Sequence, residues 1–342
     1  MASFGLFLNA GAALGSTHDE VFRLTLERAE LADRLGYYDL WVSEHHFIPF
    51  GINPSALTLA AFLLGRTQRM RVGTAITLAP LYHPLQLAEQ VALLDQCSGG
   101  RLDFGIGRGG YLEDYKAFGV NTDRWSDEVE ATASLLLKAW TEEKVESDNP
   151  WFPFSAVSLN PRPLSRPHPP LYLATSTPES VALAASNGLP LLHYWGTPHA
   201  ARQKVEEHYA AAASSAGRDV TPHIHSLIVV VGDDEKALRA RLTEALIAAF
   251  DAGDWPHVPQ MKNRHVDENG NPVPREMLAQ FVASEAIIGP EDVVKERLTA
   301  FQQSFGASRF VLYMEAIPDR ALILSSIERF AANVMPHFSP DN

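Results

Sequence analysis

The chain has 342 residues, of which 46% are hydrophobic and 20% are charged, so it is long enough to bury a substantial core. Its formal net charge of -13, with no long lysine and arginine run, excludes nucleic acid and anionic membranes as main partners. The first residues carry no basic leader and no apolar run approaches a membrane span, so we expect a cytoplasmic protein. The single cysteine, Cys97, excludes an internal disulfide, and the apolar pattern around it predicts a buried thiol.

Short apolar runs typical of strands alternate with segments of helical period along the chain. The predicted strands are Phe4–Leu8, Tyr38–Ser43, Met70–Thr77, Arg101–Ile106, Leu171–Ala174, Leu189–Tyr194, His225–Val231 and Ser308–Tyr313. The predicted helices are His18–Leu35, Pro84–Gln96, Ser126–Trp140, Glu179–Ala185, Ala200–Ala216, Glu235–Phe250, Pro290–Phe305 and Asp319–Val334. Eight such repeats without a linker-like break favour an α/β fold of one (β/α)8 barrel domain over residues 1–342, rather than an open doubly wound sheet.

Two long segments interrupt this alternation, Asn149–Pro170 and Asp251–Gly289, and loops of such length are usually functional or disordered. Residues 251–285 carry Trp255 and several prolines and lie late in the barrel. We therefore predict that they form a lid over the barrel mouth that excludes water from the site.

Three ionisable residues, Glu44, His45 and His46, follow the second predicted strand, where the carboxyl end of a barrel strand opens onto the active-site face. Alternation along the strand would turn His45 one way and its two neighbours the other. Adjacent histidines rarely ligate one metal ion, and no metal-binding spacing supports them, so we expect no metal here. Two interpretations remain, a structural histidine pair and an acid/base role for His45, and we favour the second.

The segment Pro54–Leu64 is apolar almost all round, whereas an outer barrel helix needs only one buried stripe. Its second apolar face must be covered, either by the chain's own long segments or by a second subunit. We expect a homodimer.

The stretch Arg101–Tyr111 sets Arg108 among glycines at the end of a predicted strand. Glycines let backbone N–H groups approach a ligand closely, and a guanidinium matches phosphate geometry, so the stretch predicts an anion site. Gly105, Gly107 and Gly110 also satisfy G-x-G-x-x-G, but no helix opens at the third glycine, which disfavours a dinucleotide fold. A structural glycine turn with a solvent-facing arginine is the other alternative.

After the fifth predicted strand, Thr177 is a natural N-cap, Pro178 suits the first helical position and Ser180 falls in the first turn. A helix N-terminus lined with hydroxyls is a potential anion site, although an ordinary cap without a ligand is about as common. Combined with Arg108 on the neighbouring strand's loop, it predicts a phosphate-sized site between strands four and five.

Several of these segments resemble the bacterial luciferase-like flavin-dependent monooxygenases, and most closely the luciferase alpha subunit. The segments that carry the resemblance are residues 43–51, 72–75, His83-Pro84, 94–111, Phe118-Gly119, Leu159-Asn160-Pro161 and Val334-Met335-Pro336. The likeness covers nearly the whole chain, and several of the motifs are long and occur in order.

The resemblance implies a barrel that binds reduced FMN at its carboxyl-end mouth. It implies that the flavin phosphate contacts Arg108, Ser176, Thr177 and Ser180. It also implies that His45 is the catalytic residue and that a non-proline cis peptide between Ala75 and Ile76 supports the flavin ring. The aromatic residues that it implies along the site are Tyr111 and Trp195. The luciferase alpha subunit has a cysteine beside the flavin where this chain has Gly107, and a glutamate where it has Ser176. Its long mobile segment has no recognisable match in residues 251–285, which argues against light emission.

The function that the resemblance implies is an FMNH2- and O2-dependent monooxygenase that acts on a small organic substrate through a flavin C4a-peroxide. Because the sequence shows no credible nicotinamide fingerprint, we expect a separate flavin reductase to supply FMNH2, although some members of the family take a hydride directly. Two alternatives stay open: an F420-dependent dehydrogenase or reductase on the same fold, and a non-catalytic flavin-binding partner subunit.

Overall fold

The computed structural model describes residues 2–11, 16–48, 51–110, 112–121, 125–252 and 273–339. Within these residues, eight parallel strands pair in a ring in the order in which they occur in the chain, and the last pairs with the first. A backbone bridge between Leu173 and Leu191 joins the fifth strand to the sixth. The strands of the ring are β1 (Ser3–Leu8), β2 (Asp39–Val42), β3 (Arg71–Thr74), β5 (Leu102–Gly107), β8 (Leu171–Ala174), β9 (Leu192–His193), β10 (Ile224–Val231) and β12 (Arg309–Tyr313). The predicted barrel fold is confirmed.

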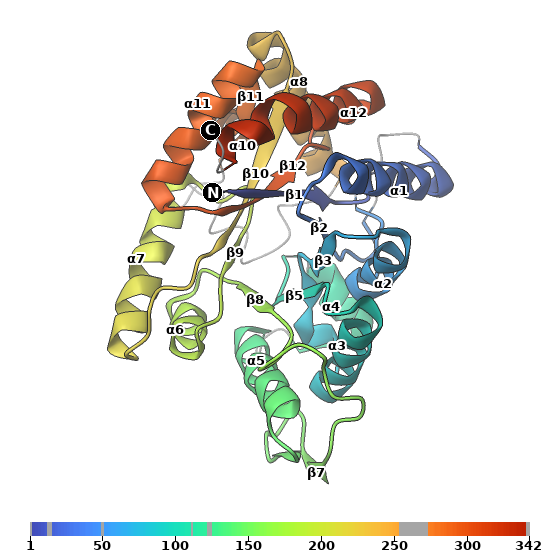
Figure 1. Ribbon diagram of the computed structural model, residues 1–342, viewed down its shortest axis with the longest axis vertical. Helices are drawn as coiled ribbons and strands as arrows, with labels where there is room; N and C mark the ends of the chain where they lie inside the picture. Colours follow the sequence, from blue (N-terminus) through green and yellow to red (C-terminus); the bar gives the residue numbers. More distant parts are fainter. Residues whose placement is uncertain are drawn as a thin grey trace.

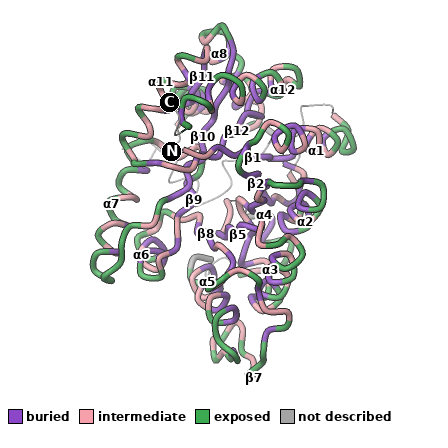
Figure 2. The backbone as a smooth tube through the Cα atoms, viewed as in Figure 1, coloured by how far each residue is buried: buried purple, intermediate pink, exposed green. Residues whose placement is uncertain are grey.

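Helices surround these strands (Figure 1). They are α1 (His18–Leu35), α2 (Ala56–Arg66), α3 (Pro84–Ser98), α4 (Leu112–Phe118), α5 (Trp125–Thr141), α6 (Pro178–Asn187), α7 (His199–Ser215), α8 (Glu235–Ala252), α10 (Arg275–Glu285), α11 (Glu291–Phe305) and α12 (Arg320–Arg329), with short helical turns η1 (Ala79–Leu81), η4 (Phe330–Val334) and η5 (Met335–Phe338). Buried positions gather along the strands, while the outward helix faces are exposed (Figure 2). Among the described residues, no helix combines the length and the apolar character that crossing a bilayer would require.

Local sequence signals explain where α1 begins and ends. Thr17 and Glu20 form a capping box, in which the Glu20 carboxylate accepts from the Thr17 backbone N–H at 3.0 Å. Gly36 ends the helix in the left-handed conformation, with φ of 84°. The first and last described segments meet, since the Ala2 N–H donates to the Phe338 carbonyl.

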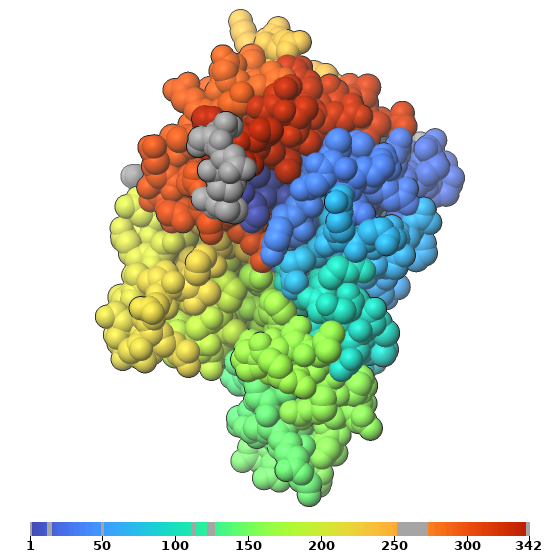
Figure 3. All heavy atoms as spheres, viewed as in Figure 1, coloured from blue at the N-terminus to red at the C-terminus, as the bar shows by residue number. Residues whose placement is uncertain are grey.

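The predicted third strand, Met70–Thr77, divides into β3 and a short β4 (Thr77–Leu78). The peptide between Ala75 and Ile76 that separates them is cis, as predicted. Three short strands were not predicted from the sequence. The first two, β6 (Val145–Ser147) and β7 (Phe154–Val157), form an antiparallel hairpin in a part of the chain that projects from the body (Figure 3).

The third missed strand, β11 (Ile287–Gly289), pairs with the last three residues of β10, beyond the part of β10 that pairs with β12. Together with α8 and α10 it encloses a second apolar cluster. The part of the predicted 251–285 lid that the structure describes is thus the helix α10, which packs on α8. Residues 253–272, including Trp255, lie outside the described residues.

The barrel interior carries a buried ionic network. The Arg309 guanidinium donates to Asp39 at 2.8 Å, to the Tyr172 hydroxyl at 2.6 Å and to Asp103. The Asp39 and Asp103 side chains are fully buried. Burial raises the pKa of Asp39, whereas the charge of Arg309 opposes that rise. The Arg71 guanidinium also donates to Asp103, at 2.7 Å. Two guanidinium groups thus compensate two carboxylates that water does not reach.

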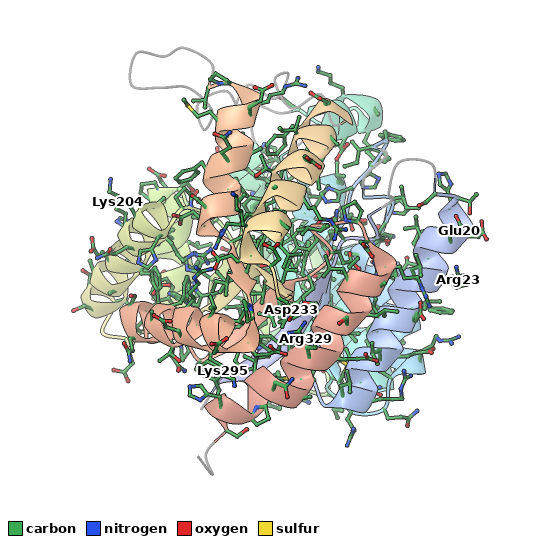
Figure 4. All side chains as sticks on the ribbon, turned by 90° about the horizontal axis from the view of Figure 1, so that it is seen from above. Glu20, Arg23, Lys204, Asp233, Lys295 and Arg329 are labelled. Atoms are coloured by element: carbon green, nitrogen blue, oxygen red, sulfur yellow. The ribbon has the colours of Figure 1, made fainter. Side chains whose placement is uncertain are left out.

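Another arginine links three elements outside the barrel. Arg329, at the end of α12, lies beside Asp233 (Figure 4) and donates to its carboxylate at 2.7 Å. It also donates to Glu291, at the start of α11, at 2.7 and 2.8 Å. These hydrogen bonds lower the pKa of Glu291 to about 2. The network therefore fixes α12 against α11 and the loop that follows β10.

On the outer surface, α2 buries most of its apolar residues within the chain but leaves Phe62 52% exposed, and Leu93 of α3 is 51% exposed. These two side chains are exposed apolar groups on the two helices through which the homodimer would form, and the homodimer stays a prediction. Cys97, also on α3, is exposed, so the predicted buried thiol is wrong. The apolar stripe of α3 passes through Leu87, Val91 and neighbouring residues and turns away from Cys97 before the helix ends.

Candidate active site

A cavity of about 300 Å³ opens at the carboxyl ends of the barrel strands. Each strand of the ring, or the loop that follows it, contributes to its wall, and so does α8. Eight of the predicted site residues line it: His45, Ala75, Ile76, Arg108, Ser176, Thr177, Ser180 and Trp195. Tyr111 lies outside the described residues, and Gly107 is not part of the lining.

Gly107 lies behind the cavity wall, at the end of β5. A Cβ atom at this position would come within 2.5 Å of Ile76 Cδ1 and 3.0 Å of the Ala174 carbonyl oxygen. A side chain here would displace Ile76 or the Ala174 carbonyl, so glycine allows the close packing of the strand, and the predicted cofactor contact of Gly107 stays a prediction.

One end of the cavity combines Arg108 with the N-terminus of α6. Tyr115, fully buried on α4, donates its hydroxyl proton to the Arg108 carbonyl and so holds the loop that carries the guanidinium. Gly109, next in this loop, has a φ of 70°, in the left-handed region that glycine tolerates best. Arg108 and the α6 N-terminus follow the paired strands β5 and β8 and line one cavity, and their joint binding of a phosphate stays a prediction.

The hydroxyl groups at the α6 N-terminus form a chain. Thr177 occupies the N-cap position, but its side chain donates to Ser180 Oγ at 3.0 Å instead of capping a first-turn N–H. Ser180 Oγ donates in turn to Glu130 Oε1, on α5, at 2.7 Å. The first-turn N–H groups of α6, which have no intrahelical acceptors, together with Arg108 make this end suited to an anion. Sequence analysis singled out no role for Glu130.

The cavity wall also includes Glu44 and His45, which follow β2. The Glu44 carboxylate accepts from the backbone N–H groups of Ala56 at 2.9 Å and Leu78 at 3.1 Å, so it ties α2 to β4. His46 turns away and packs on Phe118, with ring centroids 4.9 Å apart. The expected division between His45 and His46 is thus present, but β2 ends at Val42 and Glu44 shares the cavity with His45.

The His45 backbone N–H donates to the Asn53 carbonyl at 2.9 Å, which holds the residue at the wall. Burial, and to a lesser degree the neighbouring His46, lowers the pKa of His45 to about 4. The expectation of a pKa near neutrality is therefore wrong, because the cavity wall withholds the water that would stabilise imidazolium. At pH 7 His45 is a neutral imidazole, able to accept a proton at one ring nitrogen.

The remaining wall is apolar and aromatic. Tyr313 packs against Phe7 and Trp195, with ring centroids 5.3 and 5.2 Å apart. The α8 residues Ala245, Leu246, Ala249 and Phe250 close this side. The sequence pattern identified α8 only as a barrel helix. The signal for its place in the cavity wall is the continuous apolar run Ala245–Phe250, on a helix in which apolar and polar residues otherwise alternate.

A buried polar cluster lies between the sheet and α7 and reaches the cavity at His193. Glu206 Oε1 is 3.0 Å from His193 Nε2 and 3.5 Å from His225 Nε2, a spacing that a metal ion could bridge. Arg202 Nη1, however, lies 3.4 Å from His225 Nδ1. A guanidinium can only donate, so Nδ1 accepts and the proton of neutral His225 occupies Nε2, the atom that a metal would need. We therefore interpret the cluster as a network of neutral histidines around one carboxylate.

This cluster predicts acid lability. Burial lowers the pKa of His193 to about 3 and of His223 to about 4, and lowers that of His225 well below its usual value. The folded state therefore binds fewer protons than the unfolded state below pH 6.5, so stability is lost as pH falls through this range. Each histidine lowers the free energy of unfolding by about 1.4 kcal/mol for each pH unit below its unfolded-state pKa. The raised pKa of Glu206 offsets part of this loss of stability.

Urea unfolding at pH 7.5, 6.5 and 5.5 measures this dependence. His225→Asn should reduce the slope by about 1.4 kcal/mol per pH unit, whereas His18→Asn, at the exposed start of α1, should leave it unchanged. A wild-type stability that is flat from pH 7.5 to 5.5 would contradict the neutral-histidine interpretation.

The fold and the cavity define a (β/α)8 barrel protein with an arginine, a helix N-terminus and a neutral histidine at the carboxyl-end mouth. The chain belongs to the luciferase-like monooxygenase family, whose sequence model matches residues 2–308. It is 32% identical over 238 residues to an alkanal monooxygenase alpha chain of Photorhabdus luminescens, a match that covers 70% of this chain and 66% of that one. It thus spans slightly less than two thirds of that relative's length.

Two further comparisons extend over nearly the whole chain. The oxygenase component of a flavin-dependent trigonelline monooxygenase of Acinetobacter baylyi is 28% identical over 339 residues, which cover 94% of this chain and 91% of that one. The crystal structure of monooxygenase RslO1 from Streptomyces bottropensis superimposes with a TM-score of 0.84 at 27% identity, covering 98% of this chain and all of that one.

Proposed function

We propose that this protein is an oxidoreductase that uses reduced FMN and O2 to oxygenate a small organic substrate, with a separate reductase as the source of FMNH2. The observation that carries the proposal is the cavity itself, which joins an anion site at Arg108 and the α6 N-terminus to His45 and an aromatic wall. Family membership supports the reaction class. The relative from Acinetobacter baylyi is described as an oxygenase component, which supports a separate reductase.

The residues present fit FMN. Arg108, the α6 backbone N–H groups and Ser176 would hold its phosphate, and the surface formed by Ala75, Ile76 and the aromatic wall would support its ring system. When bound, reduced flavin supplies the electrons that activate O2. The apolar residues of α8 cover that side of the cavity and exclude water from it.

His45 would accept a proton at the reacting end of the cavity. Its neutral form predominates at pH 7 because its pKa is about 4. A neutral imidazole held at a cavity wall suits a general base that takes a proton from a substrate or flavin nitrogen or oxygen within hydrogen-bond reach.

Anaerobic mixing of the protein with photoreduced FMN, followed by oxygen, tests the proposed function. We expect substrate-dependent oxygen consumption and incorporation of one oxygen atom from 18O2 into product. Oxidation of an alcohol by F420 without oxygen uptake would favour the dehydrogenase alternative. Flavin binding without turnover for any substrate class, restored by a second polypeptide, would favour the partner-subunit alternative.

Arg108→Ala is expected to weaken FMN binding at least tenfold, because a charge-assisted guanidinium–phosphate hydrogen bond contributes about 1.5–3 kcal/mol. Riboflavin, which lacks the phosphate, should bind the variant as it binds the wild type. Flavin fluorescence titration measures both affinities, and Arg218→Ala, an exposed arginine outside the cavity lining, is the matched control. An equal loss for both ligands would show that Arg108 does not hold the phosphate.

A further inference from the structure

We propose that Glu130 makes binding of the flavin phosphate proton-coupled, so that the site takes up a proton when FMN binds and releases FMN more readily when that proton is lost. The inference rests on the proposed function and deepens it. Glu130 is half-buried on α5 and does not itself line the cavity. It acts through Ser180, which lines the cavity and donates to Glu130 Oε1 at 2.7 Å.

The direction of the hydroxyl chain carries the argument. The Thr177 proton is committed to Ser180 Oγ, and the Ser180 proton to the Glu130 carboxylate. Both hydroxyl oxygens are therefore left with lone pairs for a ligand, whereas a phosphate oxygen needs donors. In this arrangement neither hydroxyl stabilises a phosphate.

Reversing the direction of the hydrogen bond between Ser180 and Glu130 requires a proton on Glu130. An ionised carboxylate only accepts, so if Ser180 donated to phosphate the charge on Glu130 would lose its hydrogen bond and face an oxygen lone pair. A protonated Glu130 donates to Ser180 Oγ instead, and the Ser180 proton is then free for the phosphate. The proton comes from solvent and returns there when FMN leaves, so the step balances without another reactant.

Repulsion between the Glu130 carboxylate and a bound phosphate also favours protonation of Glu130. A phosphate oxygen within hydrogen-bond reach of Ser180 Oγ would lie about 4–5 Å from Glu130 Oε1, close enough for two anions to repel appreciably. Among the described residues, the charged or titratable groups on the surrounding elements include Arg108, Glu128 on α5, Glu179 on α6, and His208 on α7, whose Nε2 lies 3.1 Å from the Pro178 carbonyl oxygen. The positive charge of Arg108 offsets this repulsion only in part.

Glu130→Gln tests the proposal, because glutamine keeps the shape of the side chain and can donate to Ser180 without a proton from solvent. Fluorescence titration with oxidised FMN and with riboflavin, from pH 5.5 to 8.5, gives the affinities. At pH 8.5 the variant should bind FMN about five- to fiftyfold more tightly than the wild type, and the difference should shrink toward pH 5.5. Riboflavin affinity should not change. The phosphate's own titration near pH 6 is common to both proteins and cancels in the comparison.

Two further variants sharpen the test. Asp127→Asn removes an exposed charge from the same helix and should leave FMN affinity within about twofold. In a Ser180→Ala background the hydroxyl is gone, so Glu130→Gln should retain only the smaller effect of charge. Calorimetry in two buffers of different ionisation enthalpy should record proton uptake on FMN binding by the wild type and less by Glu130→Gln.

Unchanged or weaker FMN binding by Glu130→Gln, or an equal gain for riboflavin, would overturn the proposal. These outcomes differ from failure of the proposed function, in which the wild type would show no preference for FMN over riboflavin. Circular dichroism and thermal melting of each variant distinguish a binding effect from loss of the fold.

Discussion

Replacing His45 by alanine is expected to lower oxygenation turnover by about two to four orders of magnitude while FMN binding stays nearly intact. His45 lines the cavity, and its lowered pKa of about 4 means that its imidazole is neutral at pH 7 and has a ring nitrogen without a proton. The loss should therefore appear in kcat rather than in flavin affinity.

Single-turnover oxidation with prebound reduced FMN measures this effect. His45→Gln, which preserves a hydrogen-bonding side chain but cannot take up a proton, should be nearly as impaired as the alanine variant. His18→Ala, at the exposed start of α1, controls for the loss of a histidine. Turnover by His45→Gln at the wild-type rate would reduce His45 to a positioning residue.

Arg309→Leu is expected to destabilise the fold by about 3–5 kcal/mol, the usual cost of leaving a buried charge without its partner. Arg309 pairs with Asp39 and Asp103, whose side chains are fully buried in the barrel. Asp103 also pairs with Arg71, so Asp39 is the carboxylate that loses its guanidinium partner in this variant. Removing Arg309 also leaves the Tyr172 hydroxyl without the guanidinium beside it. This effect should exceed that of any single surface substitution.

Urea unfolding at pH 7.5 measures the loss. Arg66→Leu is the matched control, because its ion pair with Glu30 is solvent-exposed and such pairs contribute at most about 1 kcal/mol. Adding Asp39→Asn to Arg309→Leu should recover part of the lost stability, because the uncompensated charge is then removed, whereas Asp103 keeps its ion pair with Arg71. A loss of less than 1 kcal/mol for Arg309→Leu would contradict the role assigned to the network.

Much of the barrel could be predicted from the sequence because its strands are apolar runs and its helices have clear caps and periodicity. The β9 strand is two residues long where six were predicted, since only Leu192 and His193 pair with β10. The strand β11 was missed because three residues are too few to show a pattern. It depends on pairing with β10 for its existence.

Some features of the candidate site could likewise be predicted from the sequence, and others could not. Arg108, Thr177 and Ser180 could be placed together from sequence, because carboxyl ends of neighbouring parallel strands meet at one face. Glu130 could not, since its partner Ser180 is fifty residues away on another helix. Nor could the low pKa of His45, because that depends on how much water the folded wall excludes.

The amino-acid sequence by itself determined the order and kind of the barrel elements, the glycine turn at Arg108, the hydroxyl-rich start of α6 and the family resemblance. All of these are local patterns, written in consecutive residues. Only the tertiary structure decided that α8 forms a cavity wall, that Cys97 is exposed and that Gly107 lies behind Ile76. Those features depend on distances between segments far apart in the chain, which packing sets and no local pattern encodes.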